Sequence, residues 1–198
     1  MHYCQSCNVS EPMRPDDDDA VCPVCGRRDR ARRMPLLFVT GASAAGKTAL
    51  HAPLAAALAD VAAVFDFDWL IDAFGRAAEG GEIDWVAVRQ AWVAVAHGEA
   101  QQDRATVVLG QIGPNHLVDL PGLEWAASTH FLLLDCGDEV RRARIEARPA
   151  WRGRDVDEQL AWARWLREHI DDHIRTDQLT PDESVRAIAT WVRGIVAS

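Results

Sequence analysis

A short apolar run, a glycine-bounded loop and a helix-forming stretch follow one another directly in the first third of the chain. Residues 36–40 are apolar enough for a buried β-strand, and residues 49–58, rich in alanine and leucine, favour an α-helix. Residues 41–48 between them match G-x-x-x-x-G-K-[ST], a pattern whose backbone N–H groups wrap phosphate oxygens. The helix adds the positive end of its dipole to this loop. The whole unit therefore predicts a nucleotide-binding α/β protein.

The loop ends in two side chains with separate tasks. Lys47 is suited to reach the β- and γ-phosphate oxygens of a nucleotide, and the Thr48 hydroxyl is suited to hold Mg²⁺. Lys47 is also the only lysine among the 21 Lys and Arg residues, so the one compact ammonium stands where a point charge is needed. The residues predicted to bind the nucleotide are Gly41, Ala42, Ser43, Ala44, Ala45, Gly46, Lys47 and Thr48.

Size and charge limit the classes of protein that the chain can form. Its 198 residues, 48% of them hydrophobic, suffice for one ordinary domain and a small appendage. A formal net charge of -9 argues against nucleic acid or an anionic membrane as a partner, since such binding rests on Lys and Arg. No apolar run reaches the roughly 18 residues of a membrane span, and no secretory leader follows Met1. We therefore expect a globular, cytoplasmic protein.

Four of the five cysteines lie in two C-x-x-C pairs, Cys4 with Cys7 and Cys22 with Cys25. The 14 residues between the pairs are close to the spacing that places four thiolates around a tetrahedral Zn²⁺. A disulfide or a redox-active pair is the alternative, although a reducing compartment favours metal. The segment up to about residue 28 resembles a zinc ribbon, and Zn²⁺ is its expected cofactor.

We expect residues 1–33 to form this zinc-ribbon-like module with its linker, and residues 34–198 to form the main domain. So short a module cannot build a hydrophobic core and depends on its metal, which suits a structural role or a protein partner. The acidic run at 16–19 predicts a solvated tip, with a docking surface as the alternative. The five arginines within 27–33 predict a solvated linker, with contact to RNA or a ligand phosphate as the alternative.

A second apolar run, residues 61–68, predicts a strand that ends in Asp66 and Asp68. Ligands of open parallel sheets bind outside the carboxyl ends of the strands, so both acids should lie beside the phosphate loop. They would share one side of the strand if it continues through Asp68. One acid could take a proton from an attacking hydroxyl and the other could hold Mg²⁺. Alternatively one of them, Asp68 more readily than Asp66, caps the helix that starts near Trp69.

The stretch from about 69 to 104 is helical by pattern, with a break at residues 80–81. It is longer than a crossover between two strands requires, which predicts a cap over the substrate. A third strand is expected at 105–110, and His116 after it more often marks a helix start than a base. The side chains expected near the substrate are Trp69, Asp72 and Arg76 of the cap, and Gln111 and Asn115 after the third strand.

A fourth strand, residues 129–135, leads into a helix at 139–148 and a break that contains glycine and proline. This break predicts a lid at about 148–155, whose Arg148, Arg152 and Arg154 would stabilise charge on a transferred phosphoryl group. Surface ion pairs are the alternative for these arginines. A helix from 155 to about 173, a weak fifth strand at 174–176 and a last helix capped at Thr180 complete the chain.

The order of these features resembles the P-loop small-molecule kinases, which include nucleoside, nucleotide, gluconate, shikimate and adenylylsulfate kinases. The resemblance covers residues 35–198 and implies a three-layer fold with five parallel strands in the order 2-3-1-4-5. It also implies ATP and Mg²⁺ as cofactors. One departure is that the third strand ends in Gly110-Gln111, without the acid that many relatives carry there. The catalytic residues implied are Lys47, Asp66, Asp68, Arg148, Arg152 and Arg154.

The resulting hypothesis is transfer of the γ-phosphoryl group of ATP to a hydroxyl, or to a phosphate, of a small metabolite such as a nucleoside or a sugar-like alcohol. One alternative is a P-loop ATPase or switch whose ribbon binds a protein or RNA partner. Another is a kinase for nucleic-acid ends, which the acidic charge opposes. Specificity for the acceptor would depend on a few side chains of the cap and of the loops after the strands.

Overall fold

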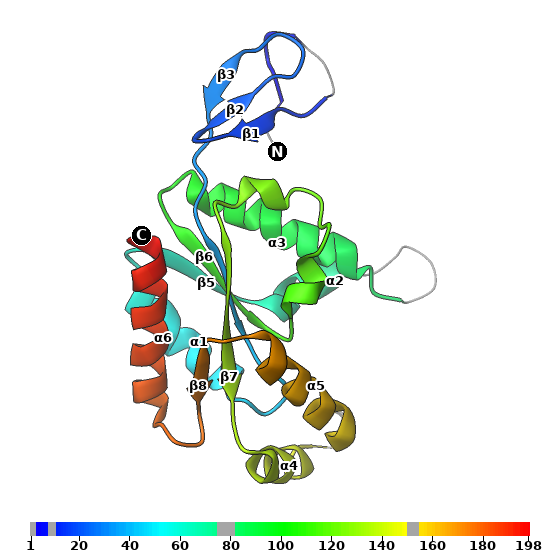
Figure 1. Ribbon diagram of the computed structural model, residues 1–198, viewed down its shortest axis with the longest axis vertical. Helices are drawn as coiled ribbons and strands as arrows, with labels where there is room; N and C mark the ends of the chain where they lie inside the picture. The colour runs from blue at the N-terminus through cyan, green and yellow to red at the C-terminus, as the bar shows by residue number, and fades with distance from the viewer. Residues whose placement is uncertain (1–2, 8–10, 75–81, 150–154) are drawn as a thin grey trace.

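The computed structural model describes residues 3–7, 11–74, 82–149 and 155–198 (Figure 1). Its largest element is a five-stranded parallel sheet in the order β5-β6-β4-β7-β8. Numbered along the main domain these strands run 2-3-1-4-5, so the predicted order is confirmed. The strands are β4 (Leu36–Thr40), β5 (Ala62–Asp66), β6 (Ala105–Gly110), β7 (Thr129–Asp135) and β8 (His173–Arg175).

Strand β4 lies in the middle of the sheet because all of its side chains can be buried at once. Every residue of β4 and of its neighbour β6 is buried. Continuous burial is typical of parallel strands that have helices on both faces, since neither side of the strand meets water. The phosphate loop therefore starts from the buried centre of the sheet.

Helices cover both faces of the sheet (Figure 1). On one face α1 (Lys47–Leu58) packs against α6 (Pro181–Val196), with Leu54 and Ile188 fully buried. On the other face α3 (Trp85–Ala100) contributes the buried Trp92, and α5 (Val156–His169) packs against β7. The shorter helices are η1 (Phe67–Leu70), α2 (Ile71–Phe74), η2 (Pro114–Leu117), η3 (Leu123–Trp125) and α4 (Asp138–Glu146).

The amino-terminal segment forms a second sheet of three antiparallel strands, β1 (Arg14–Asp16), β2 (Asp19–Val21) and β3 (Arg28–Arg30). The acidic run makes the turn between β1 and β2, where Asp17 takes a left-handed conformation at φ 52. The prediction that residues 27–33 only form a solvated linker is wrong for the part that makes β3. Arg28 lies in that strand and pairs with Asp16 at 2.6 Å and with Asp19 at 2.9 Å.

The small sheet rests on the end of the main body through one tryptophan and one glutamine. Trp125 of η3 is only 4% exposed and packs with Met13 and Ala20 of the small sheet. Gln101, just after α3, accepts a hydrogen bond from the Arg32 backbone N–H at 3.1 Å and donates one to the Arg32 carbonyl at 2.8 Å. The segment that follows β3 is thus attached to the body by side chains as well as by the chain itself.

Two elements end earlier than predicted. The second strand ends at Asp66, and η1 begins at the next residue. The helix predicted to run to about 173 ends at His169, because Ile170 is extended and β8 begins at His173. The break predicted at residues 80–81 lies outside the described residues.

The capping box of α6, formed by Thr180 and Glu183, is confirmed. None of the helices in the described ranges is long and apolar enough to cross a membrane.

Candidate active site

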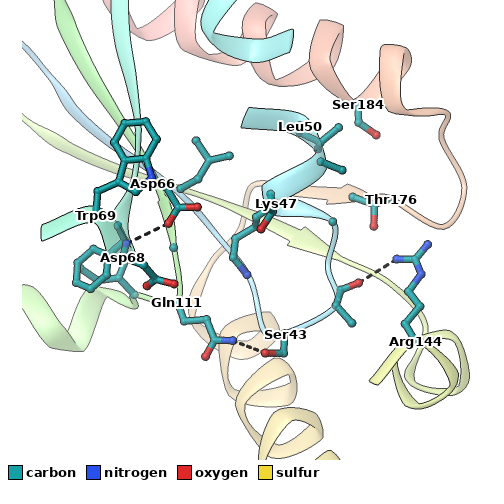
Figure 2. Close-up of a pocket in the computed structure, with 18 of the residues that line it drawn as sticks. Ser43, Lys47, Leu50, Asp66, Asp68, Trp69, Gln111, Arg144, Thr176 and Ser184 are labelled. Atoms are coloured by element: carbon teal, nitrogen blue, oxygen red, sulfur yellow. Dashed lines mark hydrogen bonds between the residues drawn. The ribbon is translucent and has the colours of Figure 1, made fainter. Parts of the chain in front are cut away.

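The carboxyl ends of β4, β5 and β6 open into a cavity of about 1340 Å³ (Figure 2). The phosphate loop and the first turn of α1 form one wall, and residues of η1, α3 and the start of η2 form the opposite wall. Thr176, Leu179, Pro181 and Ser184, which follow β8 and enter α6, close a third side. The sheet edge named in the sequence analysis is therefore the floor of this cavity.

The phosphate loop depends on two glycines and one strained alanine. A Cβ on Gly41 would lie 2.3 Å from the Leu134 carbonyl, so only glycine fits beside the neighbouring strand. Gly46 has φ 98 and Ala44 has φ 67, in the left-handed region that side chains other than hydrogen avoid. Helix α1 begins directly after Gly46, so its unpaired N–H groups end in the loop. Such a turn offers several N–H donors to one anion.

Lys47 folds back over the loop from the first turn of α1. Its Nζ donates to the carbonyls of Gly41 at 2.5 Å and of Ala42 at 3.2 Å. Burial and the nearby Arg141 guanidinium lower the pKa of Lys47 to about 8, against the opposing effect of Asp68 and Asp66. The ammonium is therefore held in a place where added negative charge would stabilise it.

Three side chains from distant parts of the chain hold the carbonyls of the loop. Arg141 donates to the Ser43 carbonyl at 2.7 Å, and Arg144 donates to the Ala44 carbonyl at 3.0 Å. Thr176 donates to the Ala45 carbonyl at 2.9 Å. Because the carbonyls are bound from outside, the loop keeps its conformation without a nucleotide.

Arg141 can do this because its charge is balanced in the interior. It is fully buried and donates to Asp135 at 2.6 Å, and Asp135 itself is 3% exposed at the end of β7. Arg167 of α5 binds the same carboxylate at 2.7 Å and also Asp138 at 2.7 Å. The two carboxylates raise the pKa of Arg167. The sequence analysis missed Asp135 and Arg167, although a carboxylate at the end of a strand is the signal that identified Asp66.

Asp66 and Asp68 are close in the chain but have different surroundings. The Asp66 carboxylate accepts the backbone N–H of Asp68 at 3.0 Å and caps η1. The alternative that one of the two acids caps this helix is therefore confirmed, although the capping residue is Asp66 and not Asp68. Burial and the neighbouring Asp66 charge raise the pKa of Asp68, while Lys47 lowers it. Figure 2 shows both acids on one side of Lys47, with Arg144 and Thr176 on the other.

Gln111 occupies the end of β6, where many P-loop kinases carry an acid. Its side-chain amide donates to the Ser43 hydroxyl at 2.8 Å and to Gln159 at 3.2 Å. The Gln159 oxygen in turn accepts the backbone N–H of Ser43 at 2.8 Å. Gln111 lines the main cavity, as expected, but it also supports the loop. Asn115 instead lines a second hollow of about 480 Å³ beside α5.

Of the predicted lid arginines, Arg148 lines the main cavity. Thr48 and Trp69 line it as well. Asp72 belongs to α2, but its side chain is not among those that the structure describes. Arg76, Arg152 and Arg154 lie outside the described residues.

The four paired cysteines form a cluster compatible with one metal ion. All four Sγ atoms lie within 4.8 Å of one another, with Cys4 and Cys25 at 3.7 Å and Cys7 and Cys22 at 3.9 Å. Four sulfurs bound tetrahedrally to Zn²⁺ lie about 3.8 Å apart, so the spacing fits. Hydrogen bonding with Cys25 and burial raise the pKa of Cys7, as expected for thiols crowded together without a cation. The cluster thus has the geometry predicted for a zinc-ribbon-like module.

The fold matches solved structures, whereas the sequence alone matches nothing. No known family description and no curated protein matches the chain. A sugar kinase from Janibacter sp. is 21% identical, with a TM-score of 0.53 over 81% of this chain and 95% of that one. Shikimate kinase from Aquifex aeolicus is 16% identical, with a TM-score of 0.50 over 81% and 97%. A tunicamycin resistance protein from Deinococcus radiodurans is 17% identical, with a TM-score of 0.59 over 81% and 96%.

These neighbours establish the architecture of the main domain. Two of the three are kinases of small molecules, one of a sugar and one of shikimate. The chain therefore has the P-loop NTPase fold of small-molecule kinases, with a cysteine-rich module added at its amino terminus. At identities of 21% and below, the likeness concerns the fold. The argument about activity rests on the cavity.

Proposed function

We propose that the protein transfers the γ-phosphoryl group of ATP to a hydroxyl group of a small molecule. The observation that carries the proposal is the position of Asp68, a carboxyl with a raised pKa that shares one cavity with the phosphate loop and Lys47. The cavity of about 1340 Å³ exceeds the roughly 300–1,000 Å³ of a pocket for one small ligand, which favours two ligands bound together. The sugar kinase and the shikimate kinase among the structural neighbours agree with this proposal.

In the proposed reaction the phosphates of ATP lie along the loop and the acceptor lies near η1. Asp68 takes the proton of the acceptor hydroxyl while the oxygen of that hydroxyl attacks the γ-phosphorus. The bond from that phosphorus to the bridging oxygen breaks, and ADP leaves with the electron pair. Asp66 keeps the Asp68 turn in place through its cap hydrogen bond. Lys47 and the loop N–H groups bind the negative charge of the phosphates.

The proposal also assigns the cation and the remaining positive charges. The Thr48 hydroxyl at the start of α1 would hold Mg²⁺, which screens the phosphate charge. Arg148 lines the cavity and is proposed, with Arg152 and Arg154, to balance charge that develops on the transferred group. Gln111 cannot replace the missing strand-end acid as an anionic ligand, so Asp66 and Asp68 are the carboxylates that line this cavity.

A panel of acceptors tests the proposal. Sugars, nucleosides and hydroxy acids are incubated with Mg·ATP, and ADP formation and product phosphate are measured. Transfer should occur to at least one class and should fall by about 100- to 1,000-fold in Lys47→Ala. The control Arg186→Ala, on the exposed side of α6, should keep full activity. Transfer unaffected by Lys47→Ala would contradict the mechanism, and ATP hydrolysis that no acceptor accelerates would favour the ATPase alternative.

For the small sheet we propose a structural zinc ion bound by Cys4, Cys7, Cys22 and Cys25. The carrying observation is the mutual distance of the four sulfurs. Elemental analysis of the purified protein should find one zinc per chain, and Cys22→Ser should abolish it. Cys136 is the matched control, because it is a buried cysteine far from the cluster that lies beside Ala44. Cys136→Ser should keep the metal, and loss of zinc in both variants would overturn the assignment.

A further inference from the structure

Arg89 is a partly buried guanidinium without a hydrogen-bond or ion-pair partner among the described residues, and it lines the cavity on the side proposed for the acceptor. Its Nε is fully buried and has no hydrogen-bond acceptor. Within the described residues no hydrogen bond or ion pair involves its side chain. By contrast Arg141, Arg144 and Arg167, around the phosphate loop, all bind a carbonyl or a carboxylate. A guanidinium is rarely taken out of water without such a partner.

Helix α3 aims Arg89 at the turn that carries the acids. Residues 85, 89 and 92 are spaced i, i+4 and i+7 and so lie on one face of the helix. Both tryptophans of this face contact Phe67: the Trp85 ring stacks on it with centroids 6.4 Å apart, and Trp92 Nε1 donates to its carbonyl at 3.2 Å. Arg89 lies between these two contacts along the helix. It therefore faces η1 on the Phe67 side, on the wall across from the phosphate loop, and lines the same cavity as Asp68.

A second donor stands near Arg89. His116 lines the same cavity, and its Nδ1 accepts the backbone N–H of Gly113 at 3.1 Å. That contact puts the ring proton on Nε2, which makes Nε2 a hydrogen-bond donor. Burial and the positive charge of Arg89 lower the pKa of His116, so the ring stays neutral. Burial alone lowers the pKa of Arg89, because no carboxylate is near enough to balance it.

The surroundings of these donors are apolar and open. Trp69 is 58% exposed and Trp85 is 43% exposed, and both line the cavity. Phe67 and Ile112 complete this part of the wall. Large exposed rings beside one unpaired cation suit a ligand with an apolar or ring-shaped body and an anionic group.

We infer that Arg89 binds an oxyanion of the phosphoryl acceptor, a carboxylate or a phosphate, with His116 as a second donor. The inference rests on the proposed function for the identity of the ligand as the acceptor. The substrate class is then an anionic molecule with an apolar or ring-shaped body that carries the reacting hydroxyl. The planar fork of the guanidinium would donate hydrogen bonds to two oxygens of one oxyanion side by side, and this would orient the hydroxyl toward Asp68.

Simple probes test the anion site apart from turnover. Benzoate, phenyl phosphate and the neutral benzyl alcohol are titrated into the full chain saturated with Mg·ADP, and dissociation constants are measured by calorimetry. At least one anion should bind more tightly than benzyl alcohol. Arg89→Ala should weaken that anion by about 30-fold or more and leave benzyl alcohol unchanged. Comparison of benzoate with phenyl phosphate tells which oxyanion the site prefers.

Two further variants complete the test. Arg89→Lys keeps the charge but not the planar fork and should recover part of the affinity. Arg186→Ala, an exposed arginine of α6, should bind all three probes as the native chain does. The inference is overturned if neither anion binds better than benzyl alcohol, or if both Arg89→Ala and Arg89→Gln bind the anions normally. Calorimetry of Mg·ADP binding shows that each variant is folded.

Transfer assays separate this inference from the proposed function. If Arg89 controls anion binding but no acceptor is phosphorylated, the anion site stands and the kinase proposal fails. If neutral acceptors are phosphorylated as well as anionic ones, and Arg89→Ala does not change kcat/KM for either, the kinase proposal stands and the role of Arg89 is wrong.

Discussion

The two walls of the cavity differ in whether their arginines are paired with other groups of the protein. Around the phosphate loop Arg141, Arg144 and Arg167 are bound to carbonyls or carboxylates of the protein itself. On the wall made by η1 and α3, Arg89 is unpaired among the described residues and Trp69 is exposed. The first wall is complete before any ligand arrives, whereas the second lacks partners that a ligand could supply.

This difference separates the part of the site that suits any nucleotide from the part that can discriminate between ligands. A loop whose carbonyls are held from behind can bind the phosphates of any nucleotide, because it contacts them with backbone N–H groups. A wall of side chains with unmet hydrogen-bond capacity discriminates between ligands, because a ligand without the matching group leaves the donor unpaired. Under the proposed function, the side chains of η1 and α3 would therefore select the acceptor.

The largest expected effect comes from the two acids at the start of η1, Asp66 and Asp68. Asp68→Asn should lower kcat by about 100- to 10,000-fold, because the amide cannot take the proton of the acceptor. Asp66→Asn should cost less than about tenfold, because asparagine still accepts the Asp68 backbone N–H and caps η1. Steady-state kinetics of both variants check this, and equal losses would mean that the two acids share one role.

The pH dependence of the native protein sharpens the same assignment. A base must be ionised to act, and the pKa of Asp68 is raised. The acid limb of kcat/KM should therefore lie above the ordinary aspartate pKa, with activity falling as the pH drops through it. The limb should disappear in Asp68→Asn and remain in Asp66→Asn.

A smaller effect concerns stability and compares one arginine from each wall. Arg141→Met should lower the free energy of unfolding by about 3 kcal/mol, because the buried Asp135 would keep Arg167 as its one ion-pair partner among the described residues. Arg89→Met should change it by less than about 0.5 kcal/mol or stabilise the protein, since no protein partner is lost. Urea unfolding at neutral pH measures both, and a loss in Arg89→Met as large as in Arg141→Met would contradict the contrast.

The smallest effect is a pH dependence of nucleotide binding on the loop wall. The pKa of Lys47 is lowered to about 8, so the free protein loses this proton as the pH rises above that value. The dissociation constant of ATP should then increase by up to about tenfold per pH unit, because binding needs the ammonium. Lys47→Met should bind ATP more weakly but without this dependence. A constant affinity of the native protein up to pH 10 would argue against the lowered pKa.

Much of the main domain could be predicted because short stretches of its sequence specify their own backbone. The third and fourth strands were placed at 105–110 and 129–135, as they occur, since both are continuous apolar runs. Thr180 and Glu183 predicted the start of α6 through a local capping box. The paired cysteines predicted their cluster by spacing. The strands and the capping box depend on residues within one short stretch, and the cysteine cluster depends on a spacing that the sequence shows directly.

The remaining features could not be read from neighbouring residues. Arg28 lies in β3, a segment that its charge alone predicted to be a linker, and it forms an ion pair with Asp16 of β1. Asp66 and Asp68 look equivalent in sequence, and only the end of β5 at Asp66 makes one a cap and leaves the other in the cavity. Trp125 was not singled out, and it packs with the small sheet across a long sequence separation.

The sequence by itself determined that a phosphate-binding loop joins a buried strand to a helix at residues 36–58, and that four cysteines can share a metal. The tertiary structure decided which charges are satisfied within the protein and which remain for a ligand. Arg141 and Arg89 are the same residue type in helical surroundings. They differ because the fold brings Asp135 to one and no acid among the described residues to the other. Pairing of this kind depends on how distant elements pack, and no local pattern encodes it.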